Sequence, residues 1–333
     1  MSQEFALGWA EDDNNAPAHI RAFLNGQIVG STTSTIRRKD LEDIAAKGGA
    51  RARSFTLLYD RPLDDRDVAS VEIYHGSSQT PMAKIQKLRI DRHPRLRIFI
   101  LGSPRSGTSE LGDTLARQLE LPWLGEGHAA PLFAAAANSF TGDIDSPNGL
   151  VRFLAQQNFR QIAIDAARTA YYSVHASASF LDKTPGHPMI SATPFLLECF
   201  PDAKFIFLYR NGISNVLSRM AKFGGNFETH CTDWATAMTE WLRVKQLLPH
   251  YLELRQEDML LEPHDVAMRA AQYLGYADKA DGIARSLGAG SRERTGAGIG
   301  RDTLSQTEWS AAQVSFFKRV CGPMMEHFSY QLS

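Results

Sequence analysis

The chain contains 333 residues, of which 43% are hydrophobic and 22% charged, as is typical of a folded globular protein with about two domains. Its 36 Lys and Arg residues nearly balance 37 Asp and Glu residues, which excludes a global field that recruits nucleic acid or an anionic membrane, so any anion site must be local. Three widely spaced cysteines exclude a disulfide framework, and we expect a cytoplasmic protein without a signal peptide or transmembrane segment.

Residues 1–85 consist of short candidate strands separated by turn residues. Ile20–Leu24 and Gln27–Gly30 flank the Asn25-Gly26 pair, which tolerates the positive φ angles of a type I′ turn, so this segment predicts a β-hairpin. Two further strand candidates follow it: Ser54–Tyr59 and Ala69–Tyr74. The pattern predicts a small β-sandwich domain.

A basic, proline-containing linker, predicted at residues 86–95, leads to a domain of different texture at residues 96–333. Apolar runs that suit buried parallel strands are Leu96–Leu101, Phe180–Asp182 and Phe205–Tyr209. Segments with helical spacing are Ser109–Leu119, Val151–Tyr172, Pro188–Phe200, Ile213–Phe223, Trp234–Leu248 and Gln306–His327. The alternation predicts an α/β domain with a parallel sheet flanked by helices and with ligands at the carboxyl ends of the strands. Trp234 and Trp241 share a helical stripe and are predicted to lie in the core.

A glycine- and hydroxyl-rich loop directly follows the first of these strands: Gly102-Ser103-Pro104-Arg105-Ser106-Gly107-Thr108-Ser109. In this context, backbone N–H groups and the next helix N-terminus point at an anion. The spacing is that of a Walker A loop, but Thr108 stands in place of the lysine, which disfavours triphosphate hydrolysis. The cation is Arg105, whose planar fork can hold oxyanions. We predict a P-loop-like anion site; the alternative is a turn that merely joins strand to helix.

A second basic cluster follows the strand Phe205–Tyr209. Arg210 stands at the C-terminal end of this strand, where open α/β sheets present ligand contacts. Arg210, Ser214, Ser218 and Lys222 are spaced four apart, so they share one face of the following helix. Such a face suits a phosphate monoester; the alternative is a solvated basic surface.

Together these clusters resemble the family of sulfotransferases that use 3′-phosphoadenosine-5′-phosphosulfate (PAPS). The segment Arg105–Thr108 is similar to the 5′-phosphosulfate loop of that family, and Arg210–Ser218 is similar to its 3′-phosphate motif. Leu181–Pro185 resembles the strand-end lysine motif of the protein-tyrosine and polysaccharide branches. A later motif of the family is matched by Glu257-Asp258-Met259, Pro263 and Leu274-Gly275. The resemblance covers about residues 95–333.

The N-terminal part resembles a β-sandwich module attached to some bacterial glycosyltransferases and sulfotransferases, through Gly8-Trp9-Ala10 and Leu24-Asn25-Gly26 among other segments. Departures from the family occur later in the chain. Gln256 stands where a tyrosine is common, and the loop Gly288–Arg301 lacks the Arg-Lys-Gly signature of cytosolic members. Arg292, Arg294 and Arg301 are the candidates in that loop for reaching a phosphate.

The resemblance implies in-line transfer of a sulfuryl group from PAPS to a hydroxyl acceptor, with 3′,5′-adenosine bisphosphate (PAP) as product. Glu126 suits the Glu-base branches, since a carboxylate screened from water can accept a proton near neutral pH. His128 is the rival base, because histidine titrates in the useful range without help. Lys183, with Arg105, would stabilise the leaving phosphate.

For the nucleotide, the resemblance implies contacts from both clusters: Arg105, Ser106, Gly107, Thr108, Ser109, Arg210, Ser218 and Lys222. These basic side chains would supply the charge that Mg²⁺ supplies in kinases, so no metal is expected. The sandwich module favours a saccharide or glycolipid as acceptor, with a peptide tyrosine or a small alcohol as alternatives.

Two other functions fit parts of the sequence. A P-loop kinase of unusual sequence would need a carboxylate for Mg²⁺, and Asp182 is the strand-end candidate. A non-enzymatic saccharide-binding protein would depend on the N-terminal module.

Overall fold

A computed structural model of the chain describes residues 5–11, 16–35, 51–61, 63, 70–76, 78–81, 96–123, 125–139, 156–175, 177–288 and 303–332. The chain divides into two compact units, one of residues 1–94 and 168–178 and one of residues 95–167 and 179–333. The predicted linker, and Arg292, Arg294 and Arg301 of the predicted late loop, lie outside the described residues.

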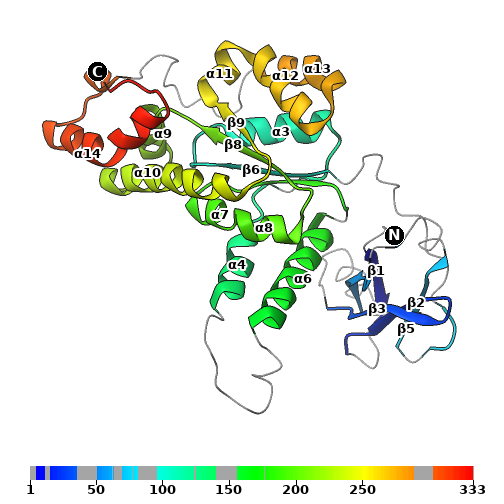
Figure 1. The fold of residues 1–333 in the computed structure, drawn as a ribbon. Coiled ribbons are helices and arrows are strands. Elements are labelled where there is room, and N and C mark those ends of the chain that lie inside the picture. The colour runs from blue at the N-terminus through cyan, green and yellow to red at the C-terminus, as the bar shows by residue number, and fades with distance from the viewer. Residues whose placement is uncertain are drawn as a thin grey trace. The chain divides into compact units, whose positions relative to one another are not determined.

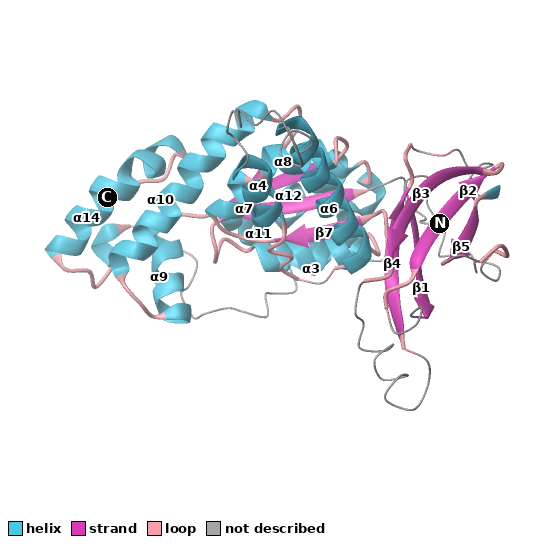
Figure 2. Cartoon of the chain, turned by 90° about the horizontal axis from the view of Figure 1, so that it is seen from below, coloured by secondary structure: helices cyan, strands magenta, loops and turns pink. Residues whose placement is uncertain are grey.

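The first unit contains two antiparallel sheets, whose strands are drawn in magenta in Figure 2. The strands are β1 (Phe5–Glu11) with β4 (Ala52–Leu58), and β2 (His19–Leu24) between β3 (Gln27–Thr33) and β5 (Glu72–His75). The predicted hairpin joins β2 to β3, and Asn25 and Gly26 turn the chain with φ angles of 52° and 78°.

Both sheets of this unit contribute to one apolar core. In β2, Ile20, Ala22 and Leu24 are buried, whereas the intervening Arg21 and Phe23 are partly exposed. This period of two places one face of the strand on the core. The core also receives Ala6, Ala10, Phe55, Leu57 and Ile73. The prediction of a small β domain ahead of the α/β domain is therefore confirmed.

The second unit is built on a four-stranded parallel sheet with the strand order β7-β6-β8-β9. Its strands are β6 (Arg97–Gly102), β7 (Phe180–Lys183), β8 (Lys204–Tyr209) and β9 (Leu252–Arg255). The chain leaves β6 towards β7 on one side and leaves β8 towards β9 on the other side. The neighbouring strands β6 and β8 therefore form a topological switch point, and loops at the carboxyl ends of such strands bind ligands in open α/β sheets.

Helices cover both faces of this sheet (Figure 1), and each face has its own kind of side chain. One face carries Ile98 and Ile100 of β6 and packs on aliphatic residues of α3 (Thr108–Gln118), α12 (Pro263–Leu274) and α13 (Ala280–Gly288). The opposite face carries Phe99, which packs against Phe180, Phe200 and Phe205. A sheet buried on both faces needs near-continuous apolar strands, which is the pattern that predicted a parallel sheet.

The aromatic face is covered by α7 (His187–Ser191), α8 (Thr193–Cys199) and α10 (Phe227–Val244), as Figure 1 shows below the sheet. Trp234 and Trp241 of α10 are fully buried, and the Trp241 ring stacks on Phe207 with centroids 4.4 Å apart. Their predicted core role is confirmed. Aromatic rings of this size bury more surface than other side chains and dominate core energetics.

The remaining helices are α4 (Ala130–Ser139), α6 (Gln156–His175), α9 (Gly212–Phe223), α11 (Gln256–Leu261) and α14 (Ala311–His327), with short 3₁₀ turns at Lys245–Leu247, Ala277–Lys279 and Leu304–Gln306. The single helix predicted at Pro188–Phe200 is wrong: it breaks at Ala192, and Pro194 starts α8 in its first turn. Helix α10 begins before the predicted Trp234, because the Asn226 side chain accepts a hydrogen bond from the Thr229 N–H group and caps it.

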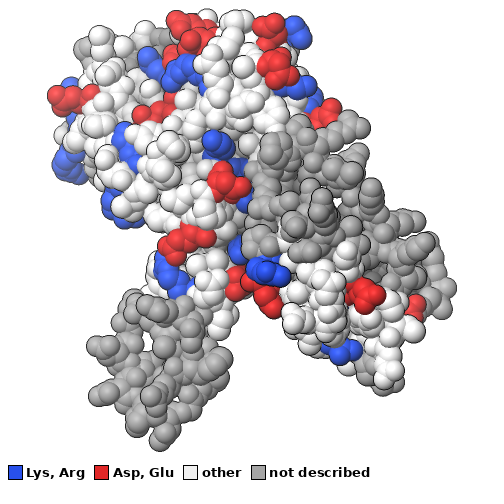
Figure 3. Space-filling view, turned by 45° about the vertical axis from the view of Figure 1, so that its right-hand side comes forward, with Lys and Arg blue, Asp and Glu red and all other residues white. Residues whose placement is uncertain are grey.

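Charged side chains of both signs are interspersed on the face of the molecule shown in Figure 3, which agrees with the near-zero net charge. No helix in the described parts of the chain combines the length and the apolar character needed to cross a membrane.

Candidate functional site

The loop between β6 and α3 has the backbone geometry of an anion-binding turn. Arg105 (φ 71°) and Gly107 (φ 84°) are both left-handed, and residues of this kind within a turn direct successive N–H groups towards one side. Gly107 caps α3 and has no side chain to accept the first N–H groups of the helix. Added at Gly107, a Cβ atom would lie 2.9 Å from the Gln256 side chain, so both conformation and space require glycine.

The hydroxyl groups predicted in this loop differ in exposure. Ser106 and Thr108 are buried, at 0% and 3% exposed, whereas Ser109 is exposed on the first turn of α3. Ser106 and Thr108 therefore belong to the packed interior of the loop, and Ser109 faces solvent.

The structure brings the two basic clusters predicted from the sequence into contact. The Arg105 Nε atom donates a hydrogen bond to the Ser218 hydroxyl (3.1 Å), and the Arg210 Nη1 atom donates one to the Arg105 carbonyl oxygen (3.1 Å). Arg210 follows β8, and Asn211 caps α9 by accepting from the N–H groups of Ile213 and Ser214. The loop after β6 and the helix after β8 thus form one polar surface at the switch point.

The face predicted on α9 is more buried than a solvated surface. Ser214 and Ser218 are 8% and 2% exposed, and Lys222 lies exposed in the last turn of the helix. The two serines are therefore enclosed by the protein, with Ser218 in contact with Arg105, whereas Lys222, one turn after Ser218, is open to solvent.

A second group of candidate residues meets at the carboxyl end of β7. The Lys183 Nζ atom donates to the Glu126 Oε1 atom (2.6 Å), and the His128 Nε2 atom lies 2.8 Å from Glu126 Oε2. The Lys183 side chain is 5% exposed, whereas those of Glu126 and His128 are 38% and 62% exposed. One carboxylate therefore joins a buried ammonium group to a histidine that is open to solvent.

The expectation that Glu126 is screened from water is not met in this structure, because its side chain is more than a third exposed. The carboxylate is instead bound by Lys183, and this ion pair holds it in place. Burial of an ammonium group without a counter-charge is costly, so Glu126 also stabilises Lys183.

Glu126 reaches Lys183 because the chain before it runs beside β7. Trp123 forms a parallel bridge with Leu181, and the Leu181 N–H group donates to the Pro122 carbonyl oxygen (3.2 Å). In the other direction, Lys183 is paired with Ile100 of β6, so it lies beside the strand that leads into the anion-binding loop. Adjacent strands are about 4.8 Å apart. The Lys183–Glu126 pair and the anion-binding loop therefore lie close together, at the carboxyl ends of neighbouring strands.

Asp182 and Thr184 hold the loop that carries Glu126 and His128, a role that no sequence pattern indicated. Asp182 is 1% exposed and accepts hydrogen bonds from the Thr184 hydroxyl (2.7 Å) and the Gly127 N–H group (3.3 Å). The Thr184 hydroxyl accepts one from the His128 N–H group (3.3 Å). Added at Gly127, a Cβ atom would lie 2.7 Å from the Asp182 carboxylate, so a glycine between two acid–base candidates is the signal that could have revealed this contact.

Glu257 connects three segments of the second unit through hydrogen bonds. It accepts hydrogen bonds from the Asn211 N–H group (2.9 Å), the Tyr330 hydroxyl (3.0 Å) and Arg255 Nε (3.3 Å). Burial, and then the charge of Glu257, raise the pKa of Tyr330 above its ordinary range, so this hydroxyl stays a donor. The start of α9 is thereby fixed to the end of β9 and to the C-terminal segment.

Comparisons with known proteins give one family match and several similar solved structures. A family model described as "Sulfotransferase family" matches residues 97–280. Similar solved structures include the sulfotransferase domain from the Synechococcus PCC 7002 olefin synthase (22% identity, covering 75% of this chain and 100% of that chain, TM-score 0.44). Others are sulfotransferase STF9 from Mycobacterium avium (14%, 72% and 79%, 0.44) and mouse sulfotransferase SULT7A1 complexed with PAP (13%, 71% and 86%, 0.41). The comparison with curated protein sequences gives no match.

Proposed function

Because the chain belongs to the sulfotransferase family, we propose that this enzyme transfers a sulfuryl group from PAPS to a hydroxyl group of an acceptor, without a metal ion. The observation that carries the proposal is the contact between Arg105 and Ser218, which joins the loop after β6 to the helix after β8. A nucleotide with phosphate groups at both its 5′ and 3′ positions needs two anion sites on neighbouring segments of the protein.

In this proposal the two anion sites bind opposite ends of the nucleotide. The loop N–H groups, the N-terminus of α3 and Arg105 bind the 5′-phosphosulfate, with Ser106, Gly107, Thr108 and Ser109 forming the loop. Arg210 and Ser218 bind the 3′-phosphate, and Lys222 at the end of α9 adds a positive charge.

In the transfer step, the acceptor hydroxyl oxygen forms a bond to sulfur while the bond from sulfur to the phosphate oxygen breaks. The proton of the hydroxyl passes to Glu126, whose carboxylate Lys183 holds in place, or to His128. Lys183 and Arg105 stabilise the charge that develops on the leaving phosphate, and PAP is the product. Catalysis of this kind depends on positioning and electrostatics.

The structure favours this mechanism over a P-loop kinase mechanism. Asp182, the carboxylate that a kinase would use for Mg²⁺, is almost fully buried and accepts hydrogen bonds from Thr184 and Gly127. A non-enzymatic saccharide-binding protein is set aside because the matched family consists of enzymes.

As acceptor we propose a saccharide or a glycolipid, supported by the resemblance of residues 1–85 to modules attached to glycosyltransferases. We further propose that the chain consists of a β domain at residues 1–85, a linker at residues 86–95 and a sulfotransferase domain at residues 96–333. We also propose a cytoplasmic location, supported by three cysteines that are buried thiols: Cys199, Cys231 and Cys321.

A thermal-shift screen with PAPS, PAP, ATP with Mg²⁺ and oligosaccharides tests the proposed function. PAPS and PAP are expected to raise the melting temperature, because a ligand at 100 times its Kd stabilises the native state by about 2.7 kcal/mol. That corresponds to a shift of several degrees for a domain of this size. A shift with ATP and Mg²⁺ but not with PAP would support the kinase alternative and contradict the proposal.

A pair of arginine variants serves as the control for this screen. Arg210→Met is expected to reduce the shift produced by PAP, whereas Arg243→Met, which changes an exposed arginine paired with Glu240, should retain it. Equal shifts in both variants would remove Arg210 from the nucleotide site.

A further inference from the structure

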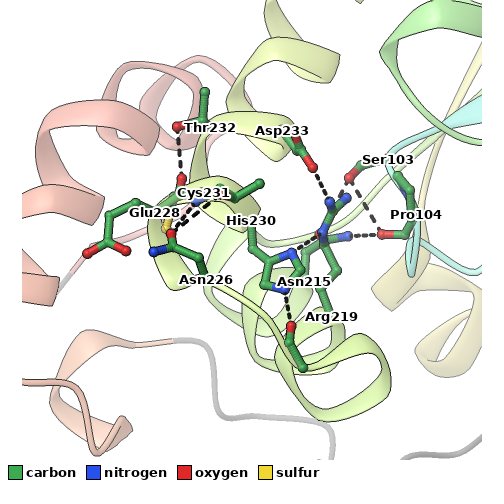
Figure 4. A network of polar contacts seen from close by, with 12 residues as sticks. Ser103, Pro104, Asn215, Arg219, Asn226, Glu228, His230, Cys231, Thr232 and Asp233 are labelled. Carbon is green, nitrogen blue, oxygen red and sulfur yellow. Dashed lines mark hydrogen bonds and ion pairs between the residues drawn. The ribbon is translucent and has the colours of Figure 1, made fainter.

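Asn215 is fully buried on α9 and directs its side-chain amide at the loop after β6. Its Nδ2 atom donates to the Pro104 carbonyl oxygen (2.9 Å) and the Ser106 hydroxyl (3.1 Å), and its Oδ1 atom accepts from the Ser103 hydroxyl (3.4 Å). Figure 4 shows Asn215 next to Ser103 and Pro104. An amide side chain has two donor hydrogens and one acceptor oxygen, and these contacts engage all of them with one loop.

These contacts determine where the carbonyl groups of the loop point. An anion is attracted by N–H groups and repelled by carbonyl oxygens, so an anion-binding loop must turn its carbonyl groups away. Asn215 holds the Pro104 carbonyl towards α9, and Arg210 does the same for the Arg105 carbonyl (3.1 Å). The left-handed Arg105 between these bonds is unfavourable for a residue with a Cβ atom and needs such support.

The helix that carries Asn215 is itself anchored from its other side. Arg219, one turn further along α9, donates to His230 Nδ1 (3.2 Å) and to Asp233 Oδ2 (2.5 Å) on α10, as Figure 4 shows. His230 in turn contacts the Gly224 carbonyl oxygen through Nε2 (2.6 Å). Because α9 is fixed against α10, Asn215 positions the loop relative to a rigid support.

We infer that Asn215 is a positioning residue for the 5′ end of the nucleotide: it holds residues 103–106 in the anion-binding conformation without contacting the nucleotide itself. This inference rests on the proposed function, because it assigns the loop to the 5′-phosphosulfate. Since Ser218 lies on the same helix and contacts Arg105, Asn215 also fixes the spacing between the 5′ and 3′ phosphate sites.

Calorimetric titration with three nucleotides separates the two ends of the site. The probes are PAP, adenosine 5′-monophosphate and adenosine 3′-monophosphate. Asn215→Leu, similar in volume but unable to form hydrogen bonds, should weaken PAP and the 5′-monophosphate roughly 10- to 100-fold. Binding of the 3′-monophosphate should change by less than about 3-fold, because Arg210 and Ser218 remain in place.

Two further variants keep the test decisive. Asn215→Asp has the same shape but places an acceptor against the Pro104 carbonyl, so it should show the same selective loss if Asn215→Leu does not fold. Asn226→Ala is the matched control: it removes an asparagine that caps α10, away from the loop, and should leave the ratio of the three affinities unchanged.

The outcomes distinguish this inference from the proposed function. If the wild-type protein does not bind PAP, the proposed function fails. If it binds PAP but Asn215→Leu and Asn215→Asp weaken all three nucleotides equally, or none of them, then Asn215 has only a structural role and the inference is overturned. A loss confined to PAP and the 5′-monophosphate supports it.

Discussion

Glu126 lies between two basic side chains, and each of its two carboxylate oxygen atoms contacts one of them. Oε1 accepts from the buried Lys183 ammonium, and Oε2 contacts His128 at the solvent edge. A carboxylate oxygen held in place by a lysine can accept the proton of a nearby hydroxyl group, and the neighbouring histidine is a second acceptor for the same proton. The arrangement therefore contains both of the bases that the sequence suggested.

At this scale we predict that Glu126→Gln lowers kcat by about 10²- to 10⁴-fold with PAP binding retained, because the amide oxygen can still accept from Lys183 but cannot take a proton. His128→Ala should have a smaller effect. Turnover with radiolabelled PAPS measures both, and Glu228→Gln, an exposed change on α10, is the matched control. A larger loss in His128→Ala would identify the histidine as the base.

The element on which the site depends most is α9. Its N-terminus is capped by Asn211, whose N–H group is bound by Glu257, its middle contacts the loop after β6, and Arg219 ties it to α10. Burial lowers the pKa of Arg219, which shows that desolvation of this guanidinium group opposes its contacts with Asp233. The helix is therefore held by directional polar contacts as well as by apolar packing.

For α9 we predict that Arg219→Met destabilises the protein by about 1–3 kcal/mol, because the buried Arg219 side chain no longer donates to His230 and Asp233. Scanning calorimetry should show a melting temperature lower by about 2–4 °C per kcal/mol. Arg243→Met, whose exposed pair with Glu240 spans one helical turn, should change stability by less than about 0.5 kcal/mol. Equal effects of the two changes would contradict the assigned role of Arg219.

At the scale of the whole molecule, the net charge is close to zero, so the positive charge that binds an anion must come from side chains at the site itself. Arg105, Lys183 and Arg210 all come from the carboxyl ends of parallel strands or from the loops that follow them. The C-terminal segment contributes as well, because Tyr330 donates to Glu257 and thereby supports Asn211 at the start of α9. Residues distant in sequence thus converge at one edge of the sheet.

The buried Tyr330 predicts a pH dependence of stability at this scale. Burial and Glu257 raise its pKa in the folded state, whereas the unfolded chain releases the proton near pH 10. The contribution of Tyr330 to the free energy of unfolding is therefore complete below about pH 10. Above that pH it falls by up to about 1.4 kcal/mol per pH unit. In Tyr330→Phe the loss of melting temperature between pH 8 and pH 11 should be smaller than in the wild type, and an unchanged loss would contradict this account.

The elements that local patterns specify could be predicted from the sequence. The apolar runs at β6, β7 and β8, the Asn25-Gly26 hairpin and the helix after Gly107 depend on neighbouring residues, so periodicity and turn chemistry indicated them. The short β9 was not predicted, because four residues at a sheet edge carry little periodicity. The break at Ala192 was missed, since Pro194 fits the first turn of a new helix as well as it disrupts an old one.

The sequence by itself thus determined the α/β pattern, the small β domain and which side chains stand at strand ends, since these follow from local spacing. Only the tertiary structure decided which of those side chains meet. The strand order β7-β6-β8-β9 places Lys183 and Arg210 on opposite sides of β6. The packing of a loop and of α9 then pairs Lys183 with Glu126 and sets Asn215 against the Ser103–Ser106 loop. Such contacts arise from the packing of distant segments, which no local pattern encodes.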